Sequence, residues 1–337
     1  MEIHHKSLYI ASLDAALDAD GSEVRVAVMK ATFDMVDGLL KPADVQEPVI
    51  HHDEFVGVLG ESSVNYEADG ALFKPGTDVV ITGSVFSPTG RAQKQLSATV
   101  QVGQIQHRVL VTGNRRWSWG ALRVSASEPE PFSEMPICWE RCFGGTDTQH
   151  PDPARHASEL RNPLGTGFRV LRSRESLDGA TLPNFEDPKT PMRFWDDKPI
   201  PKGLSFVGRG WTPRLRYAGT YDKRWEHERC PVMPADFDYR FFQAAPGPLA
   251  LPRHLGGGEP IVLSNITKLP MDGFTVPRIR VIFSGFARGR LFKAAANLDT
   301  VVVRSDRRQA ILVWRLKYAV ALDEAADSLR AQVEQFD

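Results

Sequence analysis

Residues 23–32 have the sequence EVRVAVMKAT, and this stretch decides the fold class. Val24, Val26 and Val28 alternate strictly with other residues, which places the three valines on one face of an extended chain. The stretch therefore predicts a β-strand.

The first third of the chain contains more strand patterns. The sequence DVVITGSVF at residues 78–86 follows a Lys-Pro-Gly turn at residues 74–76 and predicts a second strand. Residues 95–112 predict a hairpin, because valines alternate on both sides of a turn at residues 103–104.

Strand patterns return in the last third. Residues 277–286, 300–304 and 310–315 predict strands, and a turn at residues 305–308 joins the last two. Residues 317–322 can extend the same sheet.

The end of the chain predicts a helix instead. In residues 323–335, DEAADSLRAQVEQ, Asp323 suits the N-cap, and Ala326, Leu329 and Val333 form one apolar stripe.

The middle of the chain is rich in aromatic residues and has no regular period. Six of the seven tryptophans lie between Trp117 and Trp225. Residues 210–246, GWTPRLRYAGTYDKRWEHERCPVMPADFDYRFFQAAP, mix aromatic, arginine and aspartate residues, and prolines interrupt any regular element. Such a segment must be held by side-chain packing and charge pairing, or must offer these groups to a partner.

These patterns predict a mainly β protein of antiparallel, sandwich-like sheets, with a long irregular middle rich in Pro, Gly and aromatic residues and a short C-terminal helix. We expect an N-terminal β region at 1–116, the irregular region at 117–260, and C-terminal strands and helix at 261–337. The three regions are expected to form one compact unit.

Composition narrows the function. The formal net charge of −1 over 337 residues gives no basic footprint for nucleic acid. The sequence contains no apolar run of about 18 residues, so it predicts no membrane span. The first residues do not resemble a secretory signal. Three cysteines (Cys138, Cys142 and Cys230) in a long chain fit a reducing compartment. We expect a cytoplasmic protein.

No motif predicts a metal or cofactor. Cys138 and Cys142 are spaced more widely than in a zinc knuckle, and no second Cys or His pair follows. Residues 165–168, GTGF, lack the third glycine and the preceding strand of a dinucleotide site. A structural role is expected for both segments.

The acidic residues of the central segment leave three interpretations open. Asp222, Glu226 and Asp236 could include a carboxylate pair of the kind that glycosidases use. Each lies near arginines in the sequence, and a neighbouring arginine lowers a carboxyl pKa, which makes a poor general acid. Structural salt bridges are favoured, followed by a partner surface and then by catalysis.

Six ordered motifs resemble a known family. The first is WERCFGG at residues 139–145, which resembles the signature Tyr-Glu-Arg-Ala-Phe-Gly-Gly of domain of unknown function 2169 (DUF2169), a family of bacterial proteins. The others are NPLGTGF at 162–168, LPNFEDP at 182–188, Trp211-x-Pro213-Arg214, Gly219-Thr220-Tyr221-Asp222 with Trp225, and Asp236-Phe237-Asp238-x-Arg240-Phe241.

The resemblance implies a partner rather than a reaction. Members of the family are commonly encoded near type VI secretion genes, which implies an adaptor or chaperone that helps load an effector toxin onto the spike. It implies no known active site. We expect a non-enzymatic protein that binds an effector or a spike-tip protein, without nucleic acid, cofactor or metal. The alternatives are a glycan-acting hydrolase using carboxylates of the central segment or Glu140, and a structural component of the spike.

The candidate partner-binding or motif residues are those that carry the resemblance: Trp139, Glu140, Arg141, Gly144, Gly145, Asn162, Gly165, Asn184, Glu186, Trp211, Arg214, Tyr221, Asp222, Trp225, Asp236, Phe237, Arg240 and Phe241.

Overall fold

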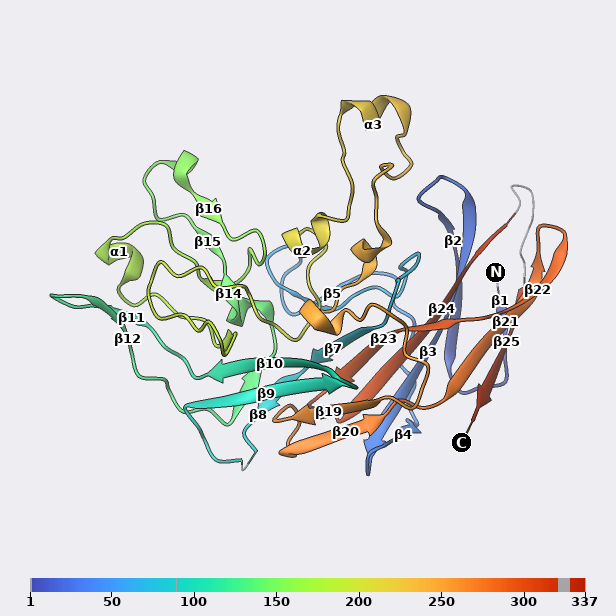
Figure 1. Cartoon of the computed structure of the whole chain (residues 1–337), viewed down its shortest axis with the longest axis horizontal. Helices are drawn as coiled ribbons and strands as arrows, with labels where there is room; N and C mark the ends of the chain where they lie inside the picture. The colour runs from blue at the N-terminus through green and yellow to red at the C-terminus, as the bar shows by residue number, and fades with distance from the viewer. Residues whose placement is uncertain (1, 89, 321–327, 337) are drawn as a thin grey trace.

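The computed structural model describes residues 2–88, 90–320 and 328–336, and these are organised mainly as β-strands (Figure 1). The largest sheet combines strands from the two ends of the chain. Its order is β2 (Ile10–Leu17), β3 (Glu23–Val36), β24 (Gln309–Ala319), β23 (Asn297–Arg304) and β7 (Asp78–Thr82), and β4 (Leu39–Pro42) also pairs with β3. All its pairs are antiparallel except β23 with β7.

A second sheet has five strands within the described residues. Its order is β18 (Phe185–Glu186), β10 (Ile105–Thr112), β9 (Gln95–Val102), β19 (Pro260–Ser264) and β20 (Met271–Thr275). The predicted hairpin is confirmed by β9 and β10, which turn at Gly103 with a φ of 55°. Glycine adopts this left-handed conformation without the steric cost that a Cβ would add.

A third sheet corrects the prediction of a C-terminal helix. Its order is β1 (Glu2–His4), β25 (Ser328–Gln335), β21 (Ile279–Ala287) and β22 (Arg290–Ala295). Residues 328–335 are therefore a strand, and the prediction of a helix there is wrong; residues 323–327 lie outside the described part. Leu329, Ala331 and Val333 also alternate with a period of two, and all three pack on the core. Pairing with β21 and β1 decided between two patterns that this short sequence fits equally.

One apolar core joins the two larger sheets. Its fully buried side chains include Val80 and Val302 from the first sheet and Val100 and Val109 from the second. Val24, Val26 and Val28 are all buried, but so is every residue from Val26 to Phe33, so both faces of this part of β3 are covered. The prediction of a mainly β fold built from the first and last thirds of the chain is therefore confirmed.

The middle of the chain forms only short elements, as expected from its prolines and glycines. They lie beside and above the sheets in Figure 1. The two-residue and three-residue strands of the middle pair locally as β11 (Trp117–Trp119) with β12 (Val124–Ala126), β14 (Phe143–Gly144) with β17 (Thr166–Gly167), and β15 (Thr146–Asp147) with β16 (Ala157–Ser158). In the first third, β5 (Glu54–Phe55) pairs with β6 (Val64–Tyr66), and β8 (Ser84–Phe86) pairs with β13 (Glu134–Pro136) from the middle. The helices are α1 (Arg174–Leu177), α2 (Thr212–Leu215), α3 (Lys223–Glu228) and the 3₁₀ turns Trp139–Arg141, Pro153–Arg155, Tyr239–Phe242 and Gly247–Leu249.

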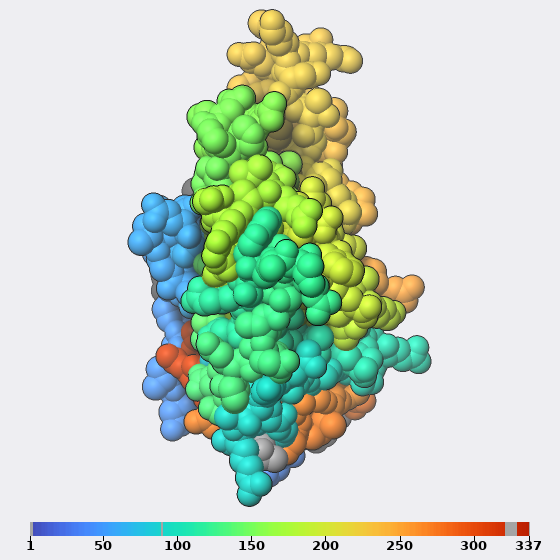
Figure 2. All heavy atoms as spheres, turned by 90° about the vertical axis from the view of Figure 1, so that its left-hand side faces the viewer, coloured from blue at the N-terminus to red at the C-terminus, as the bar shows by residue number. Residues whose placement is uncertain are grey.

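Helix α3 is carried on an arm that projects from the rest of the molecule. The arm stands out at the top of both Figure 1 and Figure 2. Tyr221 at its start is 57% exposed, and its ring packs edge-on against Trp225 at 4.6 Å. The indole N–H of Trp225 donates to the carbonyl of Val232 on the returning chain, which closes the arm on itself.

A buried ion pair links the largest sheet to the segment that follows β6. Lys30 on β3 is fully buried, and its Nζ lies 2.8 Å from Oδ2 of Asp69. The Tyr66 hydroxyl donates to the other carboxylate oxygen, and the Lys30 ammonium lies 4.2 Å from the Tyr66 ring centre. Burial lowers the pKa of Lys30, and the nearby Asp69 charge opposes that change.

Replacing Asp69 by Asn should therefore destabilise the protein strongly. The substitution keeps the shape but leaves the Lys30 charge buried without an anion, which costs about 3 to 5 kcal/mol. Urea unfolding near neutral pH measures the change. Glu128→Gln is the matched control, because Glu128 pairs with Lys94 at the exposed surface and should change stability by less than about 1 kcal/mol. Equal effects of the two substitutions would contradict the prediction.

Candidate functional site

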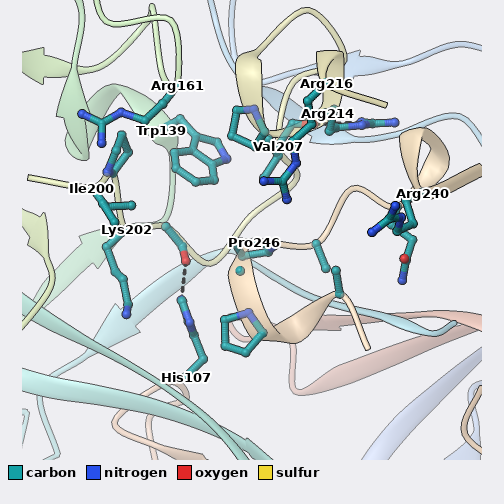
Figure 3. A pocket seen from close by; sticks show the side chains of 18 of the residues that line it. His107, Trp139, Arg161, Ile200, Lys202, Val207, Arg214, Arg216, Arg240 and Pro246 are labelled. Carbon is teal, nitrogen blue, oxygen red and sulfur yellow. Dashed lines mark hydrogen bonds between the residues drawn. The ribbon is translucent and has the colours of Figure 1, made fainter. Parts of the chain in front are cut away.

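A cationic cleft lies where the central region meets β10. Its volume is about 490 Å³, within the range of ligand pockets, and Figure 3 shows its walls. The cationic side chains that line it are Arg161, Lys202, Arg214, Arg216 and Arg240, against one carboxylate, Asp187. Trp139, Tyr217 and the prolines Pro201, Pro213, Pro246, Pro248 and Pro252 supply much of the remaining wall.

Several lining cations have acidic partners that do not themselves line the cleft. Arg161 binds Glu159 through Nε and Nη2, and Arg240 binds Asp238 through the same two atoms. Lys202 instead pairs with Asp187 at 2.9 Å, inside the cleft. The wall at both arginines thus presents the positive member of each pair, which makes the cleft locally positive.

Two arginines share one aromatic ring. The guanidinium groups of Arg216 and Arg240 lie 4.6 and 4.4 Å from the ring centre of Tyr217. Arg216 is exposed and has no ion pair among the residues that the structure describes. A cation held over an aromatic face keeps its in-plane N–H groups available to a ligand.

Arg214 is a buried arginine that connects three segments at the wall of the cleft. It is only 3% exposed, and its Nη1 lies 2.8 Å from Oε1 of Glu67. The same nitrogen donates to the carbonyl of Val207, and Nε donates to the carbonyl of Phe241. Burial by itself would raise the pKa of Glu67, but Arg214 and other nearby cations bring it below its usual range. Glu67 is therefore ionised, and the pair fixes two walls of the cleft.

His107 on β10 lines the cleft floor. It is 3% exposed, and its Nε2 lies 2.8 Å from the Gly203 carbonyl, the contact drawn as a dashed line in Figure 3. Because a carbonyl only accepts, Nε2 carries the proton and Nδ1 is unprotonated in the neutral ring. Nδ1 is buried and has no partner in the described part of the chain. Burial lowers the pKa of His107 to about 4.

The sequence motifs are brought together, but mostly as packing. Asn162 is fully buried, and its amide donates to the carbonyls of Trp139 and Phe143. A Cβ on Gly144 would lie 2.1 Å from the Asn162 carbonyl oxygen, so only glycine fits there. The first two motifs therefore form one close-packed loop unit. Gly145 and Gly165 contact each other in the same unit.

The third motif is also structural. Asn184 donates to the carbonyl of Thr112 and accepts from Arg141. Glu186 is buried against Arg115, and burial raises its pKa despite this arginine. A second hollow of about 510 Å³, on another part of the surface, is lined in part by Glu140, Arg141 and Asn184.

Trp139 and Trp211 link the motifs to the cleft. Their rings meet edge-on at 5.4 Å, and the Trp139 indole donates to the carbonyls of Ser205 and Phe206. Of the candidate residues, Trp139, Arg214 and Arg240 line the cleft. Tyr221, Asp222 and Trp225 lie on the arm, Asp236 at its base, and Phe237 and Phe241 in an aromatic cluster beside it. Whether they contact a partner stays a prediction.

Of the four carboxylates considered for catalysis, three have backbone partners; Glu226 is exposed, and no salt bridge of any of the four occurs in the described part of the chain, so the favoured expectation of salt bridges is wrong for them. Asp222 caps α3 by accepting from the Trp225 N–H, and Asp236 accepts from the backbone and hydroxyl of Thr220. Hydrogen bonds from Thr220 hold the pKa of Asp236 below its usual range. Glu140 accepts from the backbone and hydroxyl of Ser63. None of the three lines the cationic cleft.

Cys138, Cys142 and Cys230 are free thiols. Burial raises the pKa of Cys138 to about 11 and holds that of Cys142 well above its usual value, which disfavours thiolate chemistry at both. Within residues 2–88, 90–320 and 328–336, no three His, Cys, Asp or Glu side chains gather as metal ligands. Of the helices in the described part, none has the length and apolar character needed to cross a membrane.

Comparison with known protein families decides the family. The family model DUF2169, described as an uncharacterized protein conserved in bacteria, matches residues 20–315. The chain belongs to the DUF2169 family. The resemblance carried by the six motifs is therefore confirmed. Comparisons with curated proteins and with solved structures found no match.

Sequence reasoning missed part of the cleft. Arg216 and Tyr217 fall inside the aromatic segment that the sequence singled out, whereas Arg161, Lys202 and His107 do not. The last three are isolated residues far apart in the chain, and no spacing rule connects them. Only the fold brings them to one cleft.

Replacing Arg214 by Ala should destabilise the DUF2169 protein by about 3 kcal/mol, because it removes one partner of a buried ion pair. Arg209 also binds Glu67, at 2.8 Å, which places the loss at the low end of the range for such pairs. Arg216→Ala is the control, since its exposed side chain should change stability by about 0.5 kcal/mol or less. Urea unfolding compares the two, and a loss at Arg214 as small as that at Arg216 would refute the structural role.

His107 should make stability fall in mild acid. Because its pKa is about 4 in the folded protein against 6.5 when exposed, its contribution is complete above pH 6.5 and is lost as pH falls toward 4. Within this window, each unit by which the pH falls lowers the free energy of unfolding by up to about 1.4 kcal/mol.

His107→Gln retains a donor for the Gly203 carbonyl but does not titrate. Between pH 6.5 and about pH 5, the variant should lose about 1.6 kcal/mol less free energy of unfolding than the natural chain. Urea unfolding at both pH values measures the difference. Parallel losses in the two proteins would show that His107 does not titrate in this way.

Proposed function

We propose that this protein is a cytoplasmic, non-enzymatic adaptor or chaperone that binds an effector or spike-tip protein of type VI secretion at the cationic cleft. The observation that carries the proposal is the pairing of Arg216 and Arg240 on the Tyr217 ring at the cleft wall. Arginine and aromatic side chains are enriched at protein interfaces, because they bury large areas and form directed hydrogen bonds.

The composition of the wall also supports a polypeptide ligand. Five prolines and the Trp139 ring give the cleft rigid apolar surface beside its cations. A rigid wall loses little conformational entropy when a partner binds. The connection with type VI secretion rests on the resemblance to the DUF2169 family and is part of the proposal.

A hydrolase is the less favoured function. A glycosidase needs two carboxylates facing an open cleft, one of them with a raised pKa. Asp222 and Asp236 are engaged as backbone caps instead, and the pKa of Asp236 is lowered.

Pull-down of the tagged chain with the products of its neighbouring genes tests the proposal. We expect an effector or spike-tip protein to be captured, and the double variant Arg216→Ala, Arg240→Ala to reduce capture by at least about tenfold. Tyr221→Ala, which alters the exposed arm, should capture as the natural chain does. Thermal unfolding confirms that each variant is folded.

Two outcomes would overturn the proposal. One is the absence of any associated effector or spike protein with the natural chain. The other is capture that the Tyr221 variant loses and the cleft variant retains, which would move the interface from the cleft to the arm.

A further inference from the structure

The cleft combines exposed cationic groups with walls that are rich in proline. Arg216 and Arg240 are exposed on one side, and Lys202 is partly exposed on another. Proline has no backbone N–H, so walls built from residues such as Pro246 and Pro248 cannot extend a hydrogen-bonded ladder to a bound chain. The five prolines therefore reduce the backbone donors of the wall, and the cationic side chains are its main donors.

The available hydrogen-bond donors have the geometry that carboxylates require. Arg216 is held over the Tyr217 ring at 4.6 Å, with no ion pair among the described residues. Arg240 uses Nε and Nη2 for Asp238, which leaves Nη1. A planar guanidinium binds a carboxylate through two parallel N–H groups, and stacking on an aromatic ring orients it in advance.

The charge balance favours an anionic ligand over a neutral one. Five cations and one carboxylate line the cleft, and Glu67, Glu159 and Asp238, which neutralise three of the cations, do not line it. A ligand carboxylate near Arg216 therefore meets a net positive wall. Apolar surface from Val207, Ala245 and the prolines separates the cations and suits uncharged side chains between acidic ones.

Polynucleotides fit this arrangement less well. Phosphodiester backbones are bound by an extended basic track, whereas the cations here surround one cleft of about 490 Å³ on a chain of net charge −1.

Resting on the proposed function, we infer that the cleft takes an extended segment of the partner protein in which Asp or Glu alternates with apolar residues. The side-chain carboxylates bind Arg216 and Arg240, and the apolar residues contact Trp139 and the prolines. The partner is thus identified by acidic side chains rather than by a terminal carboxylate.

Fluorescence polarisation with labelled peptides tests the inference. The probe is a peptide of about ten residues in which Glu alternates with Leu or Pro, long enough to span the cleft when extended. Its ends are acetylated and amidated, so that only side chains carry charge. The comparison peptide has Gln in place of every Glu.

The Glu peptide should bind at least about tenfold more tightly than the Gln peptide. Its affinity should fall as the salt concentration rises from about 0.05 M to about 0.3 M, because Arg216 and Arg240, the cations at the rim of the cleft, are exposed and their charges are screened. The double variant Arg216→Glu, Arg240→Glu should lose at least about tenfold in affinity. Arg224→Glu, an exposed position on α3 away from the cleft, should change it less than about twofold.

Equal binding of the Glu and Gln peptides, or undiminished binding by the double variant, would overturn the inference. Tighter binding of a single-stranded oligonucleotide of similar length would do the same, as would a requirement for a free C-terminal carboxylate. Failure here is distinct from failure of the adaptor proposal: if Arg216→Ala, Arg240→Ala still abolishes capture of the partner protein, the cleft binds a polypeptide whose recognised groups are not acidic.

Discussion

The buried contact between Arg214 and Glu67 is the interaction on which the cleft depends. Arg214 joins parts of the chain that are far apart in sequence, since it contacts Glu67 and the carbonyls of Val207 and Phe241. A guanidinium can do this because it has several donors in one plane. Desolvation offsets much of the attraction in such a pair, whereas loss of one partner is costly. The main consequence is therefore to fix one arrangement of the walls.

The segment that carries Glu67 is also bonded to the centre of the largest sheet. Glu67 follows β6 directly, and Tyr66 at the end of β6 donates to Asp69, the anion paired with Lys30 on β3. A run of buried polar contacts thus connects a central strand to the cleft through one short segment. An irregular region with few regular hydrogen bonds needs such anchors, because its backbone provides little of its own order. Asp78 on β7 adds a second anchor by accepting from the Ala244 N–H.

The sequence predicted several central strands because runs of β-branched residues mark them, and β7 and β23 are buried on both faces. It missed β2, β19, β20 and β22, whose patterns are weaker. It failed at residues 328–335, where Leu329 and Val333 suit a helical stripe and a strand face equally, and a distant pairing partner decides. The family motifs located the packed loop unit around Asn162 but only part of the cleft. No local sequence pattern marks His107 or Lys202 as a cleft residue. They come from segments far apart in the chain, and only the folded structure brings them together. Short-range sequence patterns do not predict such long-range contacts.

Holding the rim cations in place has a cost and a benefit for binding. Asp238 already occupies two nitrogens of Arg240, so a ligand gains less from that arginine than from Arg216, which has no such competitor in the described part of the chain. Yet the Tyr217 ring keeps both guanidinium groups together, and mutual repulsion between them is reduced by Asp238 on one side. An incoming segment then loses little entropy in ordering the rim. Charge should consequently govern how fast a partner arrives and which partner is accepted, whereas contact with the Trp139 and proline walls should govern how long it stays.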